Sequence, residues 1–517
     1  MKPNHFTREY RLMSAKPNFL VLMADQMAAD VLPFMAQSPV IAPHMGKLAA
    51  QGVVFAGACC PSPLCAPSRF SLLSGQLPSR IGAYDNACEF PAETPTIAHY
   101  LRAGGWHTIL SGKMHFVGPD QLHGFEERLT TDIYPADFSW TPDWTRPDHR
   151  PSWYHSMDSV LTAGPTIRTN QIDYDEEVVF TARRKLYDLA RARNDRPFFM
   201  VASLTHPHDP FAIQQRYWDL YEGVDIPMPR VPFDRAALDP HSARLRHVCG
   251  ADIDPVRPDQ LRAARRAYFG AISFVDDQFG AILDTLAETG LAENTIVIVC
   301  GDHGEMLGER GLWYKMSFFE GAVRVPMVIH APQRFAPRRV EASVSTLDLL
   351  PTLLDLAGLP AADAAPVDGR SLLPHLQGSA GPDEALGEYL GEGALAPIVM
   401  IRREGWKYIH SPTDPDQLYH LAADPDERTN LAADPAHAPR IAALRAEVQA
   451  RWDLPEIAAD VLASQRRRRL VAKANATGQL THWDHQPPRD ASRAYIRAHM
   501  DLEQLEAQAR FPRVRFD

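Results

Sequence analysis

The sequence predicts an α/β fold in which a large, mostly parallel sheet is covered by helices on both faces. Three near-continuous apolar runs, at 17–24, 197–204 and 294–300, are typical of strands buried on both faces. Helical patterns occur at 175–193 and 255–290. Each apolar run is followed by polar side chains, and open α/β sheets bind ligands at the carboxyl ends of their strands. We therefore expect the functional site at that edge of the sheet.

The individual elements follow from apolar runs and from residues that start or stop helices. In the first half we expect a strand at 17–24, a helix from about 65, a helix at 94–103, a strand at 106–111 and a helix at 175–193. Pro67 and Ser68 favour a helix start, and Gly104 favours a helix end. In the second half we expect strands at 197–204, 294–300, 324–330, 398–401 and 406–410, and helices at 255–290, 346–358 and 438–452.

Length and composition indicate a large domain, a small domain and a tail. The chain has 517 residues, and its Pro-, Gly- and Ala-rich stretch at 360–385 is expected to separate the domains. We expect an N-terminal extension over 1–16, a catalytic domain over 17–375, an α+β subdomain over 376–455 and a C-terminal tail over 456–517. Met13 is an alternative start to Met1. The four arginines at 466–469 predict a solvated or ion-paired helix face.

Charge and cysteine content exclude several classes of protein. The hydrophobic content of 45% and charged content of 23% are ordinary for a soluble enzyme, and the net charge of -11 argues against a nucleic-acid partner. Residues 1–16 lack the apolar core of a signal peptide, and no window approaches a membrane span, so we expect neither export nor a membrane. The six cysteines show no C-x-x-C pattern, which favours a reducing compartment, the cytoplasm.

The strongest candidate for a nucleophile lies at 63–75. Cys65 lies one turn before Arg69 at an expected helix start. Helix N-termini favour anions, so a nucleophile there with a guanidinium beside it suits attack on a tetrahedral oxyanion ester. The alternative is a buried cysteine before a surface arginine. Asn86, farther on, could donate to an ester oxygen, hold the nucleophile or simply mark a turn.

Acids that could bind a cation follow two of the predicted strands. Asp25 and Gln26 follow the strand at 17–24, and Asp302 and His303 follow the strand at 294–300. On separate strands, Asp25 and Asp302 could converge on one cation. The amide oxygen of Gln26 can also bind a hard cation, although it adds no charge. The alternatives are that Asp25 caps the next helix and that Asp302 begins a turn.

Basic side chains follow the two other strands. Lys113 and His115 lie two residues apart in an extended segment, so they face the same way and could meet one oxyanion. His206 and His208 follow the strand at 197–204. One of these histidines is expected to contact the oxyanion or protonate a leaving group, and the other to be structural.

An aromatic loop over 130–170 is the candidate for recognising a cationic substrate. Most of its rings are expected to pack beneath the loop, but Trp140 is the candidate for a cage, because indole faces attract quaternary ammonium. Glu392 is an acid that could meet such an ammonium, and Asp501 in the tail is another. The alternative for Glu388 and Glu392 is a position on the solvated surface without a functional role.

Two segments resemble the signatures of the type I, formylglycine-dependent sulfatase family of the alkaline phosphatase superfamily. Cys65 to Gly75 matches Cys-x-Pro-Ser-Arg followed by an apolar run and a glycine, with Ser74 where threonine is usual. Residues 105–115 match Gly-Tyr-x-Thr followed by Gly-Lys-x-His, with Trp106 replacing tyrosine. The resemblance implies a large mixed, mostly parallel sheet with a smaller C-terminal subdomain. It also implies that the cysteine is oxidised to formylglycine.

The resemblance implies a role for each candidate residue. The hydrated aldehyde made from Cys65 would attack sulfur, and His115 would hold the diol and take its second proton. The implied metal ligands are Asp25, Asp302, His303 and Cys65, with Gln26 as a further one. The groups implied to stabilise the sulfuryl oxygens and protonate the leaving oxygen are Lys113, Lys315 and His208 or His206.

Softer features resemble the choline-sulfatase branch: Gln26, the polar N-terminus, the aromatic loop at 134–154 and the tail. This implies hydrolysis of choline O-sulfate with Ca2+, or alternatively Mn2+ or Mg2+. It also implies a homotetramer, a dimer of dimers in which the tail and Asp501 close a neighbouring site, and a formylglycine-generating enzyme as a transient partner. The alternatives are an arylsulfatase, a phosphonate or phosphodiester hydrolase, or a non-catalytic choline-ester binder.

Overall fold

The computed structural model describes residues 16–134, 136–192, 196–253, 255–361, 363–480, 482–488 and 501–512. The expected extension, with the alternative start at Met13, lies outside these residues except for Lys16. Among the described helices, none has both the length and the apolar character needed to cross a membrane.

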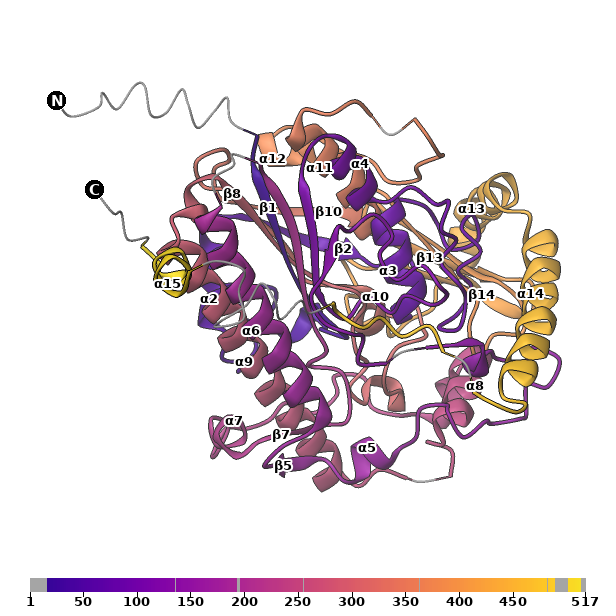
Figure 1. Ribbon diagram of the computed structural model, residues 1–517. Helices are drawn as coiled ribbons and strands as arrows, with labels where there is room; N and C mark the ends of the chain where they lie inside the picture. The colour runs from indigo at the N-terminus through magenta and orange to yellow at the C-terminus, as the bar shows by residue number, and fades with distance from the viewer. Residues whose placement is uncertain are drawn as a thin grey trace.

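An eight-stranded sheet forms the centre of the molecule (Figure 1). Its strands in spatial order are β10 (Arg338–Ser345), β2 (Val53–Cys59), β9 (Met327–His330), β8 (Thr295–Gly301), β1 (Asn18–Ala24), β6 (Phe198–Leu204), β3 (His107–Gly112) and β4 (Glu127–Arg128). Within this sheet β9 alone runs against its neighbours. The sheet is therefore mixed but mostly parallel, which confirms the predicted fold class.

The strands β1, β6 and β8 form the middle of the sheet, where Leu20 pairs with both Met200 and Val297. Every residue of β6 and β8 is buried, and β1 is buried after its first residue. Their apolar character along the whole run suits a sheet covered on both faces.

Helices cover both faces of this sheet (Figure 1). On one side lie α2 (Pro43–Gln51), α6 (Asn170–Arg191) and α9 (Pro258–Glu288), and on the other lie α3 (Cys65–Ser74), α4 (Ile97–Ala103) and α11 (Leu349–Ala357). The helix α6 begins earlier than predicted because the Thr169 side chain accepts a hydrogen bond from the N–H of Ile172.

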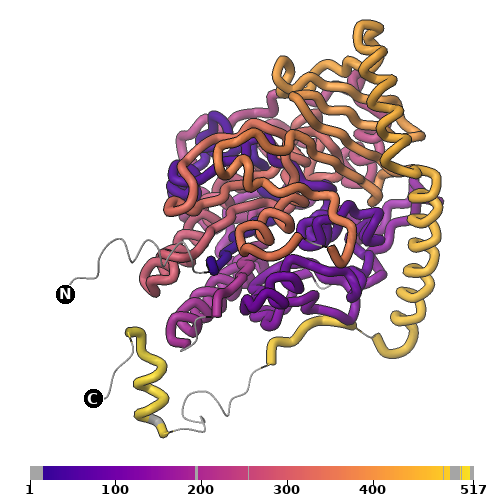
Figure 2. Tube along the Cα trace, turned by 90° about the horizontal axis from the view of Figure 1, so that it is seen from above, coloured from indigo at the N-terminus to yellow at the C-terminus, as the bar shows by residue number. Residues whose placement is uncertain are grey.

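The C-terminal part forms a smaller α+β unit, which also confirms the prediction. Its antiparallel sheet contains β11 (Ala385–Tyr389), β12 (Ile398–Arg403), β13 (Trp406–Ser411) and β14 (Asp414–His420), followed by α13 (Ala438–Arg451), α14 (Leu454–Asn475) and α15 (Leu502–Ala509). The two edge strands, β11 and β14, were not predicted; β14 is too polar to form an apolar run. Figure 2 shows α14 along the outside of the molecule, with α15 far from α14.

The remaining elements are short and connect the others. They include η2 (Phe138–Trp140), α5 (Asp158–Leu161), β5 (Gly164–Thr166), β7 (Ala212–Gln214), α7 (Gln215–Asp219), α8 (Pro240–Cys249), α10 (Glu320–Val323) and α12 (Leu373–Gln377), together with several other single 3-10 turns. The predicted loop at 130–170 is therefore interrupted by one 3-10 turn, one short helix and one short strand.

Candidate active site

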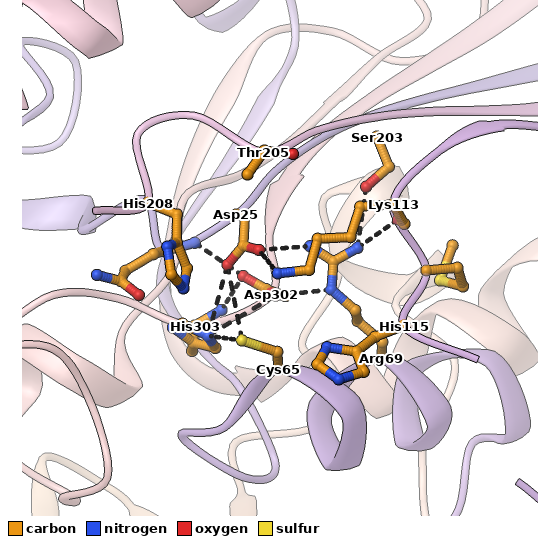
Figure 3. A network of polar contacts seen from close by, with 12 residues as sticks. Asp25, Cys65, Arg69, Lys113, His115, Ser203, Thr205, His208, Asp302 and His303 are labelled. Atoms are coloured by element: carbon orange, nitrogen blue, oxygen red, sulfur yellow. Dashed lines mark hydrogen bonds and ion pairs between the residues drawn. The ribbon is translucent and has the colours of Figure 1, made fainter. Parts of the chain in front are cut away.

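Four parallel strands place polar side chains at one edge of the central sheet. Asp25 follows β1, Lys113 follows β3, the turn that contains His208 follows β6, and Asp302 follows β8. Because these strands run in the same direction, the segments after them converge, and Figure 3 shows the four side chains around one centre.

Cys65 is brought to this centre by α3, which begins at that residue. Asn86 Oδ1 accepts a hydrogen bond of 2.9 Å from the N–H of Ala66. The hydroxyl of Ser68 donates to the carbonyl of Asp302, which ties the first turn of α3 to the end of β8. Asn86 therefore holds the start of the helix that carries Cys65, and its expected role toward the nucleophile stays a prediction.

Asp25, Cys65, Asp302 and His303 form a buried group whose candidate ligand atoms all lie within 4.8 Å of one another. His303 Nε2 lies 3.1 Å from Cys65 Sγ and 3.6 Å from Asp25 Oδ1. His303 Nδ1 donates to the Gly304 carbonyl, which leaves Nε2 directed at the group. Two carboxylates and one imidazole fit a divalent cation such as Ca2+, Mg2+ or Mn2+.

Gln26 lies next to this group, but its side chain is engaged elsewhere. Its Oε1 accepts a hydrogen bond of 2.6 Å from Lys315 Nζ, and its Nε2 donates to Glu305. Its backbone N–H donates to Asp302 Oδ1 at 2.9 Å. Because the lysine already binds the amide oxygen, metal ligation by Gln26 stays a prediction.

Arg69 is fully buried and connects both acids of the group. Its Nε lies 2.8 Å from Asp302 Oδ2, and its Nη2 lies 3.5 Å from Asp25 Oδ2. Its Nη1 donates to the carbonyl of Lys113 at 2.6 Å and to the hydroxyl of Ser203 at 2.9 Å. The alternative of a surface arginine is therefore wrong, because β6 and the segments that follow β3 and β8 supply partners for the guanidinium.

Two buried lysines supply positive charge to the same centre. Lys113 Nζ binds Asp25 Oδ2, and Lys315 Nζ lies 3.0 Å from His208 Nε2. Burial lowers the pKa of each lysine, but the nearby Asp25 and Cys65 raise it more, so that each pKa ends above its ordinary value. Both lysines therefore carry their charge at neutral pH.

These charges determine the electrostatics at the candidate nucleophile. Burial raises the pKa of the Cys65 thiol, but Lys113, Lys315 and His303 lower it well below its ordinary value. The position of Sγ is thus one where negative charge is stabilised, whether on sulfur or on an oxygen in its place. His115 lies beside Cys65 (Figure 3). Its ring meets Trp140 edge-on at 6.2 Å between centroids.

The two histidines after β6 have different surroundings. His206 Nδ1 lies 2.7 Å from Asp175 Oδ2, and its ring packs against Phe274. His208 Nδ1 donates to the backbone carbonyl of Asp209, which leaves Nε2 directed at Lys315. His208 therefore belongs to the site, and His206 has structural contacts.

The three candidates for recognising a cationic substrate lie in three different environments. Trp140 is half-buried at the end of η2, beside His115. Glu392 is 4% exposed, and burial, with the charge of Asp85, raises its pKa to about 7. Asp501 is exposed and caps α15 by accepting from the N–H of Glu503, so a single chain does not bring it to the site.

The expectation of a solvated surface is wrong for both glutamates after α12. Glu392 lies where Lys315 and Cys65 influence its pKa. Glu388 accepts hydrogen bonds from the N–H and hydroxyl of Ser79 and from Trp452 Nε1. These partners come from distant parts of the chain, which is why the local sequence does not reveal the burial.

Sequence reasoning missed several residues that support the site. Ser203 binds Arg69, and Glu305 binds Gln26 and the N–H groups of Leu307 and Tyr314. Glu305 could have been suspected, because it lies two residues after His303 in the same segment. Ser203 lies inside an apolar strand, where the sequence carries no sign of a polar partner.

Models of known protein families match nearly the whole chain. Residues 17–359 match the family model described as "Sulfatase". Residues 459–511 match "Choline sulfatase enzyme C terminal", and residues 308–453 match "N-sulphoglucosamine sulphohydrolase, C-terminal".

Individual relatives agree with these matches. The chain is 46% identical to the "Choline-sulfatase" of Rhizobium meliloti (strain 1021), over 97% of this chain and 100% of the relative. It is 29% identical to the "Arylsulfatase" of Clostridium perfringens (strain 13 / Type A), over 69% of this chain and 78% of that one. The crystal structure of the phosphonate monoester hydrolase of Agrobacterium radiobacter superposes with a TM-score of 0.69 at 26% identity, over 84% of this chain and 95% of that chain. The chain therefore belongs to the sulfatase family and is a sulfuric ester hydrolase.

Proposed function

We propose that this protein hydrolyses choline O-sulfate to choline and inorganic sulfate. The observation that carries the proposal is the position of Cys65: it begins a helix, lies among Arg69, Lys113 and Lys315, and has the buried carboxylate of Glu392 nearby. The cationic side chains around Cys65 match the sulfate group of this substrate, and the carboxylate of Glu392 matches its quaternary ammonium. The similarity to a relative named choline-sulfatase supports the same substrate.

We propose that Cys65 acts after oxidation to formylglycine. The hydrated aldehyde supplies an oxygen nucleophile for sulfur and, by returning to the aldehyde, releases sulfate without attack by water on sulfur. Asn86 and Ser68 hold the first turn of α3, so the nucleophile keeps a fixed position. His115, beside Cys65, holds the diol and takes its second proton.

A divalent cation completes this proposal. Asp25, Asp302 and His303 would hold it, with the nucleophile side chain at position 65 and with Gln26 as a further ligand. Ca2+ is the first choice for the carboxylates, and Mn2+ and Mg2+, which also prefer oxygen ligands, are the alternatives. When bound, the cation favours the ionised form of the nucleophile and polarises a sulfuryl oxygen.

The protonated side chains around Cys65 stabilise the charge that develops on the sulfuryl oxygens. Lys113 and Lys315 face this region, and Arg69 adds a charge held by two acids. Lys315 Nζ and His208 Nε2 lie 3.0 Å apart with the proton on the lysine, and this pair is assigned to supply the proton that the leaving oxygen of choline needs. The contacts of His206 with Asp175 and Phe274 support a structural role.

The ammonium end would meet Trp140 and Glu392. An indole face and a buried carboxylate together attract a quaternary ammonium. Asp501 enters this proposal only through a neighbouring chain of a homotetramer, because its own chain leaves it exposed at the start of α15.

A phosphonate or phosphodiester hydrolase is the second candidate, because a phosphonate monoester hydrolase has a similar structure. The test is sulfate release from choline O-sulfate by protein whose formylglycine content is verified by mass spectrometry, with p-nitrophenyl sulfate and a phosphodiester as comparisons. A large kcat/KM advantage for choline O-sulfate is expected. Equal low rates on both sulfates would contradict the substrate, and faster phosphodiester turnover would favour the second candidate.

A further inference from the structure

The C-terminal helix α14 carries buried polar side chains on the face that meets the rest of the chain. Ser464, Gln465 and Arg468 are buried, whereas Arg466 and Arg467 on the same helix are exposed. Buried polar groups are costly unless they are paired. The partners of this face therefore indicate what α14 holds in place.

Arg468 forms a bidentate ion pair with Asp85. Its Nη1 lies 2.7 Å from Oδ1 and its Nη2 lies 2.8 Å from Oδ2, while Arg468 is 6% exposed and Asp85 is fully buried. Burial lowers the pKa of Arg468, but Asp85 raises it more, so the guanidinium stays charged. Two parallel hydrogen bonds fix the orientation as well as the distance of the pair.

This ion pair is linked to Cys65 through Asn86 and Ala66. Asp85 Oδ1 also accepts the N–H of Ala87 at 3.0 Å, which defines the turn. Asn86, inside that turn, accepts the N–H of Ala66, next to Cys65. The position of Arg468 is thus transmitted to the first turn of α3.

The same helix face also reaches the segment with Trp140. Arg468 Nη1 donates to the hydroxyl of Thr141 at 3.1 Å, and Gln465 Oε1 accepts the N–H of Trp144 at 3.0 Å. The indole of Trp144 in turn donates to the carbonyl of Gly391 at 2.9 Å, one residue before Glu392. The residues on either side of the proposed ammonium site are therefore held by one helix.

We infer that Arg468, assisted by Gln465, is a positioning residue that aligns the proposed choline-binding side chains with the nucleophile. The inference rests on the proposed function for its choice of substrate. It assigns to α14 a role inside its own chain, through the 84–88 turn and the 138–144 segment.

The kinetic test compares Arg468→Met, Arg468→Lys and Gln465→Met with wild type on choline O-sulfate and p-nitrophenyl sulfate. Loss of the bidentate pair is expected to lower kcat/KM for choline O-sulfate by about tenfold or more relative to the aryl sulfate, because misplacing catalytic groups by about 1 Å can cost up to about a hundredfold in rate. Lysine, which cannot form the bidentate pair, should restore only part of this. Arg466→Met, exposed on the same helix, is the matched control and should behave as wild type.

A merely structural role predicts a different result. Partial unfolding would lower kcat for both substrates by the same factor and leave both KM values unchanged, and that outcome would overturn the inference. Should Arg468→Met fail to fold, Gln465→Met and Arg468→Lys decide between the same outcomes, since each removes fewer contacts.

Hydrogen exchange supplies a readout that needs no substrate. Amides at 84–88 and 138–144 are expected to exchange faster in Arg468→Met than in wild type, with β1 and β8 unchanged. If wild-type protein releases no sulfate from choline O-sulfate, the proposed function fails, yet unchanged exchange in these two segments would separately overturn the role of Arg468.

Discussion

Replacing Glu392 with glutamine tests whether a buried carboxylate recognises the ammonium of the substrate. The change keeps the shape of the side chain and removes its charge. Removing one partner of a buried charge pair costs about 2–5 kcal/mol, so KM for choline O-sulfate should rise by about 30-fold or more. For p-nitrophenyl sulfate, which has no cation, kcat/KM should change little.

The same carboxylate should make KM depend on pH. Burial is the main cause that raises its pKa to about 7, Asp85 and Cys65 add to this, and Lys315 opposes it. A cation binds the ionised form, so protonation below pH 7 weakens binding. For one such group, KM for choline O-sulfate should rise by about tenfold from pH 8 to pH 6, and Glu392→Gln should lose this rise.

The free energy of unfolding should fall as pH rises, whereas binding of the substrate should strengthen as pH rises. The ordinary pKa of 4.5 is raised to about 7 in the folded protein. Between these values the folded state binds more protons than the unfolded state, so the free energy of unfolding falls as pH rises from 4.5 through 7. Glutamine cannot ionise, and the substrate-free variant should therefore be more stable than wild type above pH 7, by at most about 3 kcal/mol.

Two measurements test the role of Glu392. The first is steady-state kinetics on both substrates from pH 6 to pH 8, and the second is thermal unfolding of the substrate-free proteins. Equal KM changes on the two sulfates would refute recognition by Glu392. Persistence of the pH dependence in Glu392→Gln would assign it to another group. A lower Tm for the variant above pH 7 would contradict the burial argument.

Three further changes test other parts of the site. Cys65→Ala should abolish turnover of both sulfates while Tm stays close to that of wild type, and residual activity near the wild-type rate would exclude Cys65 as the nucleophile. Trp140→Ala should raise KM for choline O-sulfate by about two- to 30-fold, since a cation–π contact is worth about 0.5–2 kcal/mol, and an equal effect on the aryl sulfate would argue against the cage. Asp302→Asn should weaken binding of Ca2+ or Mn2+, measured by calorimetry, with activity lost in parallel; unchanged affinity would place the cation elsewhere.

Much of the framework is visible in the sequence because it depends on local patterns. The runs at 17–24, 197–204 and 294–300 are apolar throughout, which is the pattern of strands covered on both faces. The polar residues that follow them, such as Asp25 and Asp302, had to lie at one edge once the strands were parallel. Cys65 at a helix start could be predicted because Pro67 and Ser68 favour that position.

Choices between neighbouring residues needed the tertiary structure. His206 and His208 lie in one irregular turn, where no regular period says which side chain faces the site, and only the contacts with Asp175 and Lys315 separate them. Gln26 could be assigned to a cation from the sequence, but the structure directs its oxygen to Lys315.

The sequence by itself determined which residues are candidates for the chemistry, because strand ends, helix starts and signature spacing are local properties. Only the tertiary structure decided which charges are buried, since burial depends on partners far away in the chain. Glu392 was expected at the surface and lies inside. Arg468 belongs to a run of arginines that predicts a solvated or ion-paired face, and its burial is explained mainly by Asp85, 383 residues away. A charge can leave water when an opposite charge meets it there, and only the folded chain brings the two together.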